Sequence, residues 1–339
     1  MIIRSKAPFR IGLAGGGSDV SPYSDIYGGA VLNTAISLYA KTTIIPTDDQ
    51  QITFESIDKH FKFQFESTTT LPLKEEVILQ IGVYNHFVKH YTKQPLAFKM
   101  ITEMDVPTGS GLGTSSTLVV SIIGAFCEWL NISLSPKEIA QKAFEIEREE
   151  LGMAGGKQDQ YAAALGGFNF LLFENQVKDE PLTVSHELIN ELEFNLILYY
   201  NKVKRESAKI IEAQMRNVKE KKTPSIEATH LVKKEAFFMK DELLAGRSSE
   251  IGAILNRSWE NKKRMADGIT NADIDKAYEA AMQAGALGGK ISGAGGGGFM
   301  LFYTESENRS EVTDALTNLG GEIIHFQFVS QGLESWTIK

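Results

Sequence analysis

The chain has 339 residues, 42% of them hydrophobic and 23% charged, which is long enough for two globular domains. Its net charge of −8 argues against a nucleic-acid or anionic-membrane partner, and no apolar run reaches the roughly 18 residues of a membrane helix. The lone Cys127 cannot form an intrachain disulfide, and the amino end is too soon interrupted by Arg and Pro for a signal peptide, so we expect a cytoplasmic enzyme.

The first hundred residues are predicted to mix strands and helices. Residues 7–14 indicate a buried strand that enters a glycine turn, and 30–46 a strand or short helix followed by a β-rich run. Polar and apolar residues alternate over 51–65, which is typical of a hairpin, and residues 75–91 have helical spacing.

A glycine loop at residues 109–113 follows an extended run, 96–102, and leads into Thr114-Ser115-Ser116 and an apolar helix. Strand, glycine turn and hydroxyl-rich helix start bind phosphate, because glycines expose backbone N–H groups and the helix start adds unpaired donors and a positive dipole end. No lysine follows Gly113 as a Walker loop requires, and the spacing does not match a dinucleotide-binding fingerprint. A nucleotide site of another kind is predicted; the alternative is a tight turn without a ligand.

The middle of the chain carries a clear helix start at Ser135-Pro136-Lys137-Glu138, with Ser135 as N-cap and Glu138 completing a capping box. That helix should run through Glu150. Strands are expected over 168–173 and 194–200, and the polar segment 177–191 is predicted to cross between domains.

The carboxyl half is predicted to be mainly helical over 207–285, with strands at 299–303 and 323–329. The pattern as a whole indicates an α+β protein in two parts, which we divide into residues 1–180 and 181–339.

Three glycine-rich segments together resemble the motifs of the GHMP kinases. Residues 7–19, APFRIGLAGGGSD, are similar to the first motif of that family, residues 107–116, PTGSGLGTSS, to the second, and residues 290–298, KISGAGGGG, to the third. The matches occur in the family's order, which is more specific than any one glycine run.

The resemblance implies a two-domain fold, with an amino-terminal domain like ribosomal protein S5 domain 2 and a ferredoxin-like carboxyl domain, and an active site between them. It implies an ATP-dependent phosphotransferase that acts on an alcohol group with Mg²⁺. Asp159 would face the attacking hydroxyl, Arg10 would be the catalytic cation, and Ser115 and Glu147 would hold the Mg²⁺. The nucleotide-binding residues would be Pro107, Gly109, Ser110, Gly111, Leu112, Gly113, Thr114, Ser115 and Ser116.

The first motif also bears on the acceptor. Galactokinases have Gly-Glu-His-Thr-Asp where this chain has Gly15-Gly16-Gly17-Ser18-Asp19, so the resemblance argues against a galactokinase. Together with GGKQDQY at 155–161, the motif is similar to heptose 7-phosphate kinases and the related fucokinase-type domain. The substrate-binding residues implied are Gly16, Gly17, Ser18, Asp19, Lys157, Gly293, Ala294 and Gly295, with Lys202, Lys204 and Arg205 as an alternative phosphate-binding cluster.

The leading functional hypothesis is a sugar 1-kinase for a heptose 7-phosphate. The alternatives are a kinase for another sugar such as L-fucose, a decarboxylase of the mevalonate diphosphate branch, and a catalytically silent regulator that binds ATP and sugar. The expected partners are a small-molecule sugar or sugar phosphate and a second copy of the chain in a homodimer, with no nucleic acid and no membrane.

Overall fold

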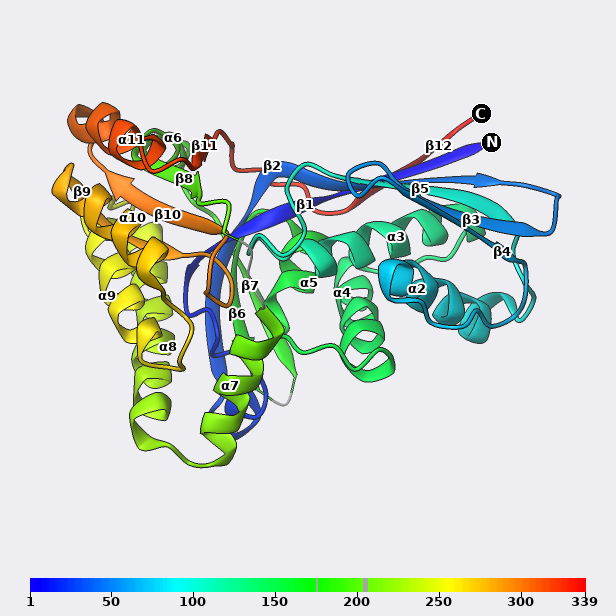
Figure 1. Ribbon diagram of the computed structural model, residues 1–339, viewed down its shortest axis with the longest axis horizontal. Coiled ribbons are helices and arrows are strands. Elements are labelled where there is room, and N and C mark those ends of the chain that lie inside the picture. The colour runs from blue at the N-terminus through cyan, green and yellow to red at the C-terminus, as the bar shows by residue number, and fades with distance from the viewer. Residues whose placement is uncertain (175, 204–206) are drawn as a thin grey trace.

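The computed structural model describes residues 1–174, 176–203 and 207–339, and consists of a larger and a smaller β-sheet with their helices (Figure 1). The larger sheet contains β1 (Ile2–Ala14), β2 (Gly29–Pro46), β3 (Gln51–Ser56), β4 (Phe61–Glu66), β5 (Phe98–Met104), β6 (Phe168–Phe173), β7 (Val177–Leu182) and β12 (Glu334–Ile338). The smaller sheet contains β8 (Leu196–Tyr200), β9 (Ala286–Ile291), β10 (Phe299–Thr304) and β11 (Glu322–Ile324).

The helices fall into two groups that follow the two sheets. The first group is α1 (Tyr23–Tyr27), η1 (Glu75–Val77), α2 (Ile78–Phe87), η2 (Val88–Thr92), α3 (Thr114–Leu130), α4 (Pro136–Phe144), η3 (Glu145–Glu150) and α5 (Gln158–Leu165). The second group is α6 (His186–Asn195), α7 (Ser207–Lys219), α8 (Thr223–Leu244), α9 (Ile251–Lys263), α10 (Ala272–Gln283), η4 (Ser306–Asn308) and α11 (Arg309–Thr317).

The larger sheet has the strand order β12-β1-β2-β5-β3-β4, and the early part of β2 pairs separately with β6, which pairs with β7. Helices α2 to α5 cover one face of it (Figure 1), and the apolar helix α3 packs against β1 and β2. Ser135 and Glu138 form the predicted capping box at the start of α4. The chain passes without interruption from α4 into the π-helical turn η3, so the predicted extent to Glu150 is confirmed.

The smaller sheet is antiparallel with the order β11-β8-β10-β9. Its elements follow the chain order strand, helices, two strands, helix, strand, which is the ferredoxin-like βαββαβ arrangement. Along β8 the buried residues alternate between two cores. Leu196 and Leu198 belong to the core of the larger sheet, whereas Ile197 and Tyr199 pack with Trp259 and the C-terminal helices. The two-domain α+β fold that the resemblance implies is confirmed.

Some predicted elements differ from the structure. Residues 177–191, predicted to cross between domains, form β7 and much of α6, and the strand predicted from residue 194 begins at Leu196 because α6 runs to Asn195. Strand β9 begins directly after the stretch predicted as helical and was not predicted itself. Strand β12 was missed because all five of its residues are exposed and only Trp336 and Ile338 are apolar. Since β12 pairs with β1, the end of the chain returns to the first sheet; the division at residue 180 stays a prediction.

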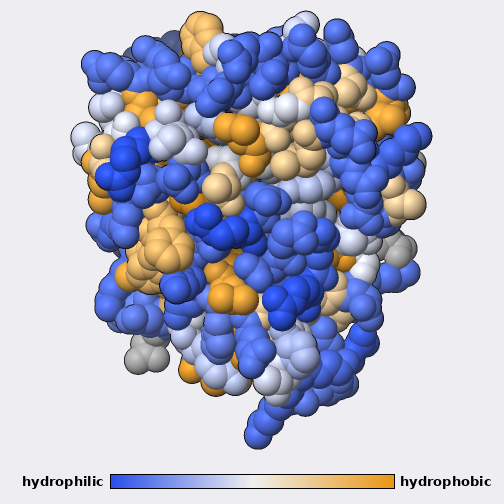
Figure 2. Space-filling view, turned by 90° about the vertical axis from the view of Figure 1, so that its left-hand side faces the viewer, coloured by the Kyte–Doolittle hydropathy of each residue, from blue (hydrophilic) through white to orange (hydrophobic). Residues whose placement is uncertain are grey.

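The surface of the molecule bears on the predicted absence of a membrane partner. On the side formed by the C-terminal helices, hydrophilic residues cover most of the face and separate several smaller apolar patches (Figure 2). Among the helices in the described ranges, none is both long enough and apolar enough to cross a bilayer. The homodimer stays a prediction.

Candidate active site

The three glycine motifs meet at one place, around the loop at residues 109–113. The backbone N–H of Arg10, from the first motif, donates to Leu112 O at 3.4 Å. From the third motif, Phe299 N donates to Ser110 O at 2.9 Å and the hydroxyl of Ser292 donates to Gly111 O at 3.0 Å. Segments almost three hundred residues apart in sequence therefore hold the phosphate loop from both sides.

The loop has the backbone geometry of a phosphate cradle. Gly109, Gly111 and Gly113 have φ of 77°, 105° and 79°, a region that residues with a Cβ rarely adopt. Gly113 is the N-cap of α3, and Gly109 N donates to Thr114 Oγ1 at 3.0 Å. The loop therefore turns tightly onto the start of a 17-residue helix, where unpaired N–H groups and the dipole favour an anion.

Arg10, which is buried, and Asp159, which is partly exposed, form an ion pair beside this loop. The Nε of Arg10 donates to Asp159 Oδ1 at 2.7 Å, and its Nη2 lies 2.6 Å from the same oxygen. The Nη1 of Arg10 donates to Gly111 O at 2.8 Å, so the guanidinium connects the carboxylate to the phosphate loop. A Cβ at Gly113 would lie 2.9 Å from the carboxyl carbon of Asp159, which explains why glycine is needed where the acid approaches.

Glu147 lies near the first turn of α3, which carries Ser115, because Gln160 Nε2 donates both to Glu147 Oε2 and to Ser116 Oγ. Glu147 is fully buried, and its Oε2 accepts from Gln160 Nε2 at 2.6 Å, whereas its Oε1 has no hydrogen-bond partner among the described residues. Burial raises the pKa of this carboxyl, against the attraction of Arg148 and hydrogen bonds from Ser116 and Gln160. The Nη1 of Arg148 lies 3.6 Å from Glu147 Oε1, beyond hydrogen-bond distance, so this buried oxygen keeps its lone pairs for a ligand. A carboxylate oxygen and the cavity-lining hydroxyl of Ser115 are oxygen ligands of the kind Mg²⁺ prefers, so these residues fit the ion.

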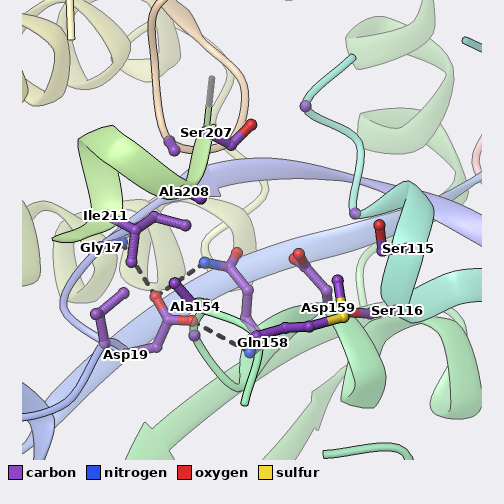
Figure 3. Close-up of a pocket in the computed structure, with 18 of the residues that line it drawn as sticks. Gly17, Asp19, Ser115, Ser116, Ala154, Gln158, Asp159, Ser207, Ala208 and Ile211 are labelled. Carbon is purple, nitrogen blue, oxygen red and sulfur yellow. Dashed lines mark hydrogen bonds between the residues drawn. The ribbon is translucent and has the colours of Figure 1, made fainter. Parts of the chain in front are cut away.

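Asp19 is saturated by donors from the protein itself. Its Oδ1 accepts from Gly17 N at 3.1 Å and Gln158 Nε2 at 3.0 Å, and its Oδ2 accepts from Lys157 N at 3.0 Å and Gln158 N at 3.2 Å (Figure 3). Gln158 is the first residue of α5, the helix that carries Asp159. The first motif therefore caps α5 from a distant part of the chain and fixes the position of the acid.

Asp19→Asn is expected to misplace Asp159, because the new amide group would face the N–H groups of Lys157 and Gln158 with a donor. We expect kcat to fall by about 10²-fold, the cost of a displacement near 1 Å, with a small change in the KM for the sugar. Steady-state kinetics on the folded variant measures the split. A large rise in KM at unchanged kcat would instead assign Asp19 to sugar binding.

A cavity of about 240 Å³ opens between these elements. Its wall is shared by the phosphate loop, the loop before α5, the first turns of α7 and the third motif (Figure 3). The predicted residues that line it are Arg10, Gly17, Asp19, Gly109, Gly111, Gly113, Thr114, Ser115, Ser116, Asp159, Gly293 and Ala294.

Other predicted residues lie behind the wall or outside it. Ser18 is buried and its hydroxyl donates to Gly15 O and Ala30 O, which makes it part of the turn. The ammonium of Lys157 lies 3.6 Å from Asp25 and over the ring of Phe144. The others that do not line the cavity are Gly16, Pro107, Ser110, Leu112, Glu147 and Gly295.

The alternative phosphate-binding cluster, Lys202, Lys204 and Arg205, stays a prediction. Lys202 is half-exposed and its Nζ lies 2.7 Å from Glu322 on β11. Lys204 and Arg205 lie outside the described residues.

Two lysines from the second domain were missed by the sequence analysis. Lys262 of α9 is buried, lines the cavity, and donates to Gly16 O at 2.8 Å. Lys290 of β9 is buried behind it and donates to Gly12 O at 2.5 Å. Burial, helped by repulsion from Lys262 and Arg10, holds the pKa of the Lys290 ammonium well below 10.5.

Because the pKa of Lys290 is lowered only in the fold, the unfolded chain binds more protons between that lowered value and 10.5. The free energy of unfolding should therefore rise with pH across this window, and Lys290→Met should reduce that rise. Urea unfolding between about pH 7 and about pH 10 measures it, since the window lies below the ordinary lysine pKa. Lys276→Met, an exposed lysine of α10, is the matched control; equal slopes in wild type and Lys290→Met would contradict the assignment.

Other residues at the site could have been found from the motif. Gln158 and Gln160 flank Asp159 in the GGKQDQY stretch and hold Asp19 and Glu147 respectively. Arg148, next to Glu147 in sequence, also lines the cavity. Lys262 carries no such signal, because Lys262-Lys263-Arg264 is typical of a solvated helix end.

Comparison with known proteins identifies the family to which this chain belongs. Residues 78–167 match the family described as the GHMP kinases N terminal domain, and residues 239–321 match the GHMP kinases C terminal family. The chain belongs to the GHMP kinases. This agrees with the site, in which the family's three motifs surround one phosphate loop.

The chain is also similar to individual sugar kinases. The chain is 42% identical over 338 residues to a D-glycero-alpha-D-manno-heptose 7-phosphate kinase of Campylobacter jejuni, covering 99% of both chains. A solved structure described as a D-glycero-D-manno-heptose 1-phosphate kinase from Bacteroides thetaiotaomicron matches with a TM-score of 0.85 and 42% identity, covering 99% of both chains. The L-fucokinase/L-fucose-1-P guanylyltransferase of Bacteroides fragilis is 26% identical over 331 residues, which are 90% of this chain and 35% of that protein.

Proposed function

We propose that this chain transfers the γ-phosphoryl group of ATP to the anomeric hydroxyl of D-glycero-D-manno-heptose 7-phosphate and forms the 1,7-bisphosphate. The observation that carries the proposal is the Arg10–Asp159 pair, which lies between a glycine phosphate cradle and a cavity large enough to admit part of a sugar. The identity of 42% over the whole chain to a heptose 7-phosphate kinase supports the choice of sugar.

The reaction needs a base, charge stabilisation and correct positioning. Asp159 accepts the proton of the anomeric hydroxyl as that oxygen bonds to the γ-phosphorus and the bond to the ADP oxygen breaks. Arg10 neutralises charge on both Asp159 and the transferring group, and the N–H groups of the phosphate loop and the start of α3 hold the phosphates. Glu147 and Ser115 would hold Mg²⁺, which supplies positive charge to the β- and γ-phosphate oxygens when bound.

A phosphorylated acceptor also needs a cation for its phosphate. Apart from Arg10, the cationic side chains that line the cavity within the described residues are Arg148 and Lys262. Lys262 comes from α9 of the second domain and reaches the first motif, so it lies on the acceptor side. We propose Lys262 for the sugar phosphate in place of Lys157.

An acceptor panel tests the function. ADP release is measured with D-glycero-D-manno-heptose 7-phosphate, the 1-phosphate, mannose, L-fucose, galactose, mevalonate and mevalonate diphosphate. ³¹P NMR identifies the phosphorylated position, and carbon dioxide release is measured with mevalonate diphosphate. We expect turnover with the 7-phosphate and a new anomeric phosphate. The 1-phosphate is included because one relative is described as a heptose 7-phosphate kinase and another as a heptose 1-phosphate kinase. Preference for L-fucose, release of carbon dioxide from mevalonate diphosphate, or binding without turnover would each replace the proposal with one of its alternatives.

Mg²⁺ dependence is a separate prediction. Chelation with EDTA should abolish turnover, and Ser115→Ala should lower kcat more than it changes sugar binding, because its hydroxyl acts on the metal and phosphates. Coupled ADP assays with a Mg²⁺ titration measure both. Full activity in EDTA would show that Glu147 and Ser115 do not hold a required Mg²⁺.

A cytoplasmic location also stays a prediction.

A further inference from the structure

A second group of side chains that could bind a metal lies where η3 packs against α2. His86 is in α2, His90 is in η2, and Glu150 ends η3. His86 Nδ1 lies 3.0 Å from Glu150 Oε1, and His90 Nε2 lies 3.9 Å from the same oxygen. One ligand atom from each residue can be chosen so that all three lie within 4.8 Å of one another.

The separation of four residues between His86 and His90 places the two imidazole rings side by side. Histidines four residues apart lie on one face of a helix, and here their ring centroids are 4.5 Å apart. The carboxylate arrives from a different helix and approaches both rings. The three side chains therefore converge on one point from the consecutive elements α2 and η2 and from the separate element η3, as metal ligands do.

The hydrogen bonding of His86 is incomplete. Its side chain is 4% exposed, and its Nε2 is buried without a hydrogen-bond partner within the described part of the chain. Its other nitrogen shares a single carboxylate oxygen with His90. A buried imidazole satisfied on one side only is unusual for a purely structural residue.

The surroundings favour one class of ion. A hollow of about 400 Å³ borders His86 and Glu150, which leaves room for an ion to enter and for water as a further ligand. Lys89 and Lys93 also line it, so the affinity must come from the imidazole nitrogens and not from net negative charge. Imidazole suits Zn²⁺ and similar transition metals, whereas Mg²⁺ and Ca²⁺ prefer oxygen ligands.

We propose that His86, His90 and Glu150 form a binding site for one Zn²⁺-type ion, separate from the Mg²⁺ site at the phosphate loop. The ion would join η2 to η3, the turn that also carries Glu147. We expect the bound ion to raise the thermal stability of the fold. The proposal does not depend on which sugar the enzyme phosphorylates.

The test uses untagged, metal-free full-length protein in excess Mg²⁺, without nucleotide. Zn²⁺ is titrated by calorimetry and thermal unfolding, and Co²⁺ by visible absorption. We expect one equivalent to bind and to raise Tm, with a tetrahedral Co²⁺ spectrum. His90→Ala and Glu150→Gln, both at partly exposed side chains, should weaken Zn²⁺ binding by at least about 10–100-fold, since even outer-shell partners are worth that much.

Two controls separate this site from others. His325→Ala removes an exposed histidine elsewhere and should leave the titration unchanged. Glu147→Gln alters the Mg²⁺ site and should also keep the Zn²⁺ response. No stoichiometric binding, or equal binding in wild type, His90→Ala and Glu150→Gln, would overturn the proposal.

Discussion

Asp159→Asn should lower kcat by about 10²–10⁴-fold, or about 3–5 kcal/mol of barrier, while ATP and sugar still bind. The substitution keeps the size of the side chain but removes the charge that orients and deprotonates the hydroxyl. Binding should survive because the phosphate loop does not depend on Asp159 for its shape; Arg10, Ser292 and backbone bonds hold it. Single-turnover phosphoryl transfer and calorimetric ATP binding measure the two parts.

The ion pair with Arg10 extends this prediction to a double-mutant cycle. Arg10→Met should also lower kcat strongly, and the double variant should lose less than the product of the two single losses, because the two groups act as one unit. Thermal unfolding checks that each variant is folded, since Arg10 is buried and also supports Gly111 O. A folded Asp159→Asn enzyme that retained more than about a tenth of the wild-type kcat would show that Asp159 is not the base.

The sequence predicted the parts of the site that depend on local pattern. The glycines at 109–113 and the hydroxyls that follow them lie between a predicted strand and a predicted helix, so their chemistry could be inferred before their positions were known. Arg10 and Asp159 needed the family resemblance, because 149 residues separate the two members of the pair. The structure places all of these residues around one loop.

The parts that were missed depend on tertiary contacts. Asp19 was predicted to bind sugar, which stays a prediction, but its sequence context does not show that four donors surround its carboxylate, two of them backbone N–H groups at the start of α5. Lys262 looks like a solvated helix lysine in sequence and is buried only because α9 packs beside the first motif. Strand β12 has five exposed residues, of which only Trp336 and Ile338 are apolar, and it pairs with β1 at the edge of the sheet. The local signal of these features is weak, since each depends on a partner far along the chain.

The last prediction concerns Gly298 of the third motif, whose backbone lies against the carbonyl group of Ser110 in the phosphate loop. A Cβ at Gly298 would lie 2.0 Å from the carbonyl oxygen of Ser110, so Gly298→Ala must push that carbonyl away. The N–H of Phe299 donates to the same oxygen and would move with it. Displacing the cradle by about 1 Å should lower kcat/KM for ATP by about 10²-fold.

Gly320→Ala is a matched control, because Gly320 has nearly the same backbone conformation. Its φ is 90° against 89° for Gly298, yet a Cβ at Gly320 would meet no heavy atom within 4 Å. Both variants should lose stability from the left-handed backbone, by about 1–2 kcal/mol, but only Gly298→Ala should also lose ATP turnover. Urea unfolding and ATP kinetics on the two variants separate backbone strain from steric displacement. If Gly298→Ala and Gly320→Ala kept equal kcat/KM for ATP, the third motif would not be what holds the phosphate loop in place.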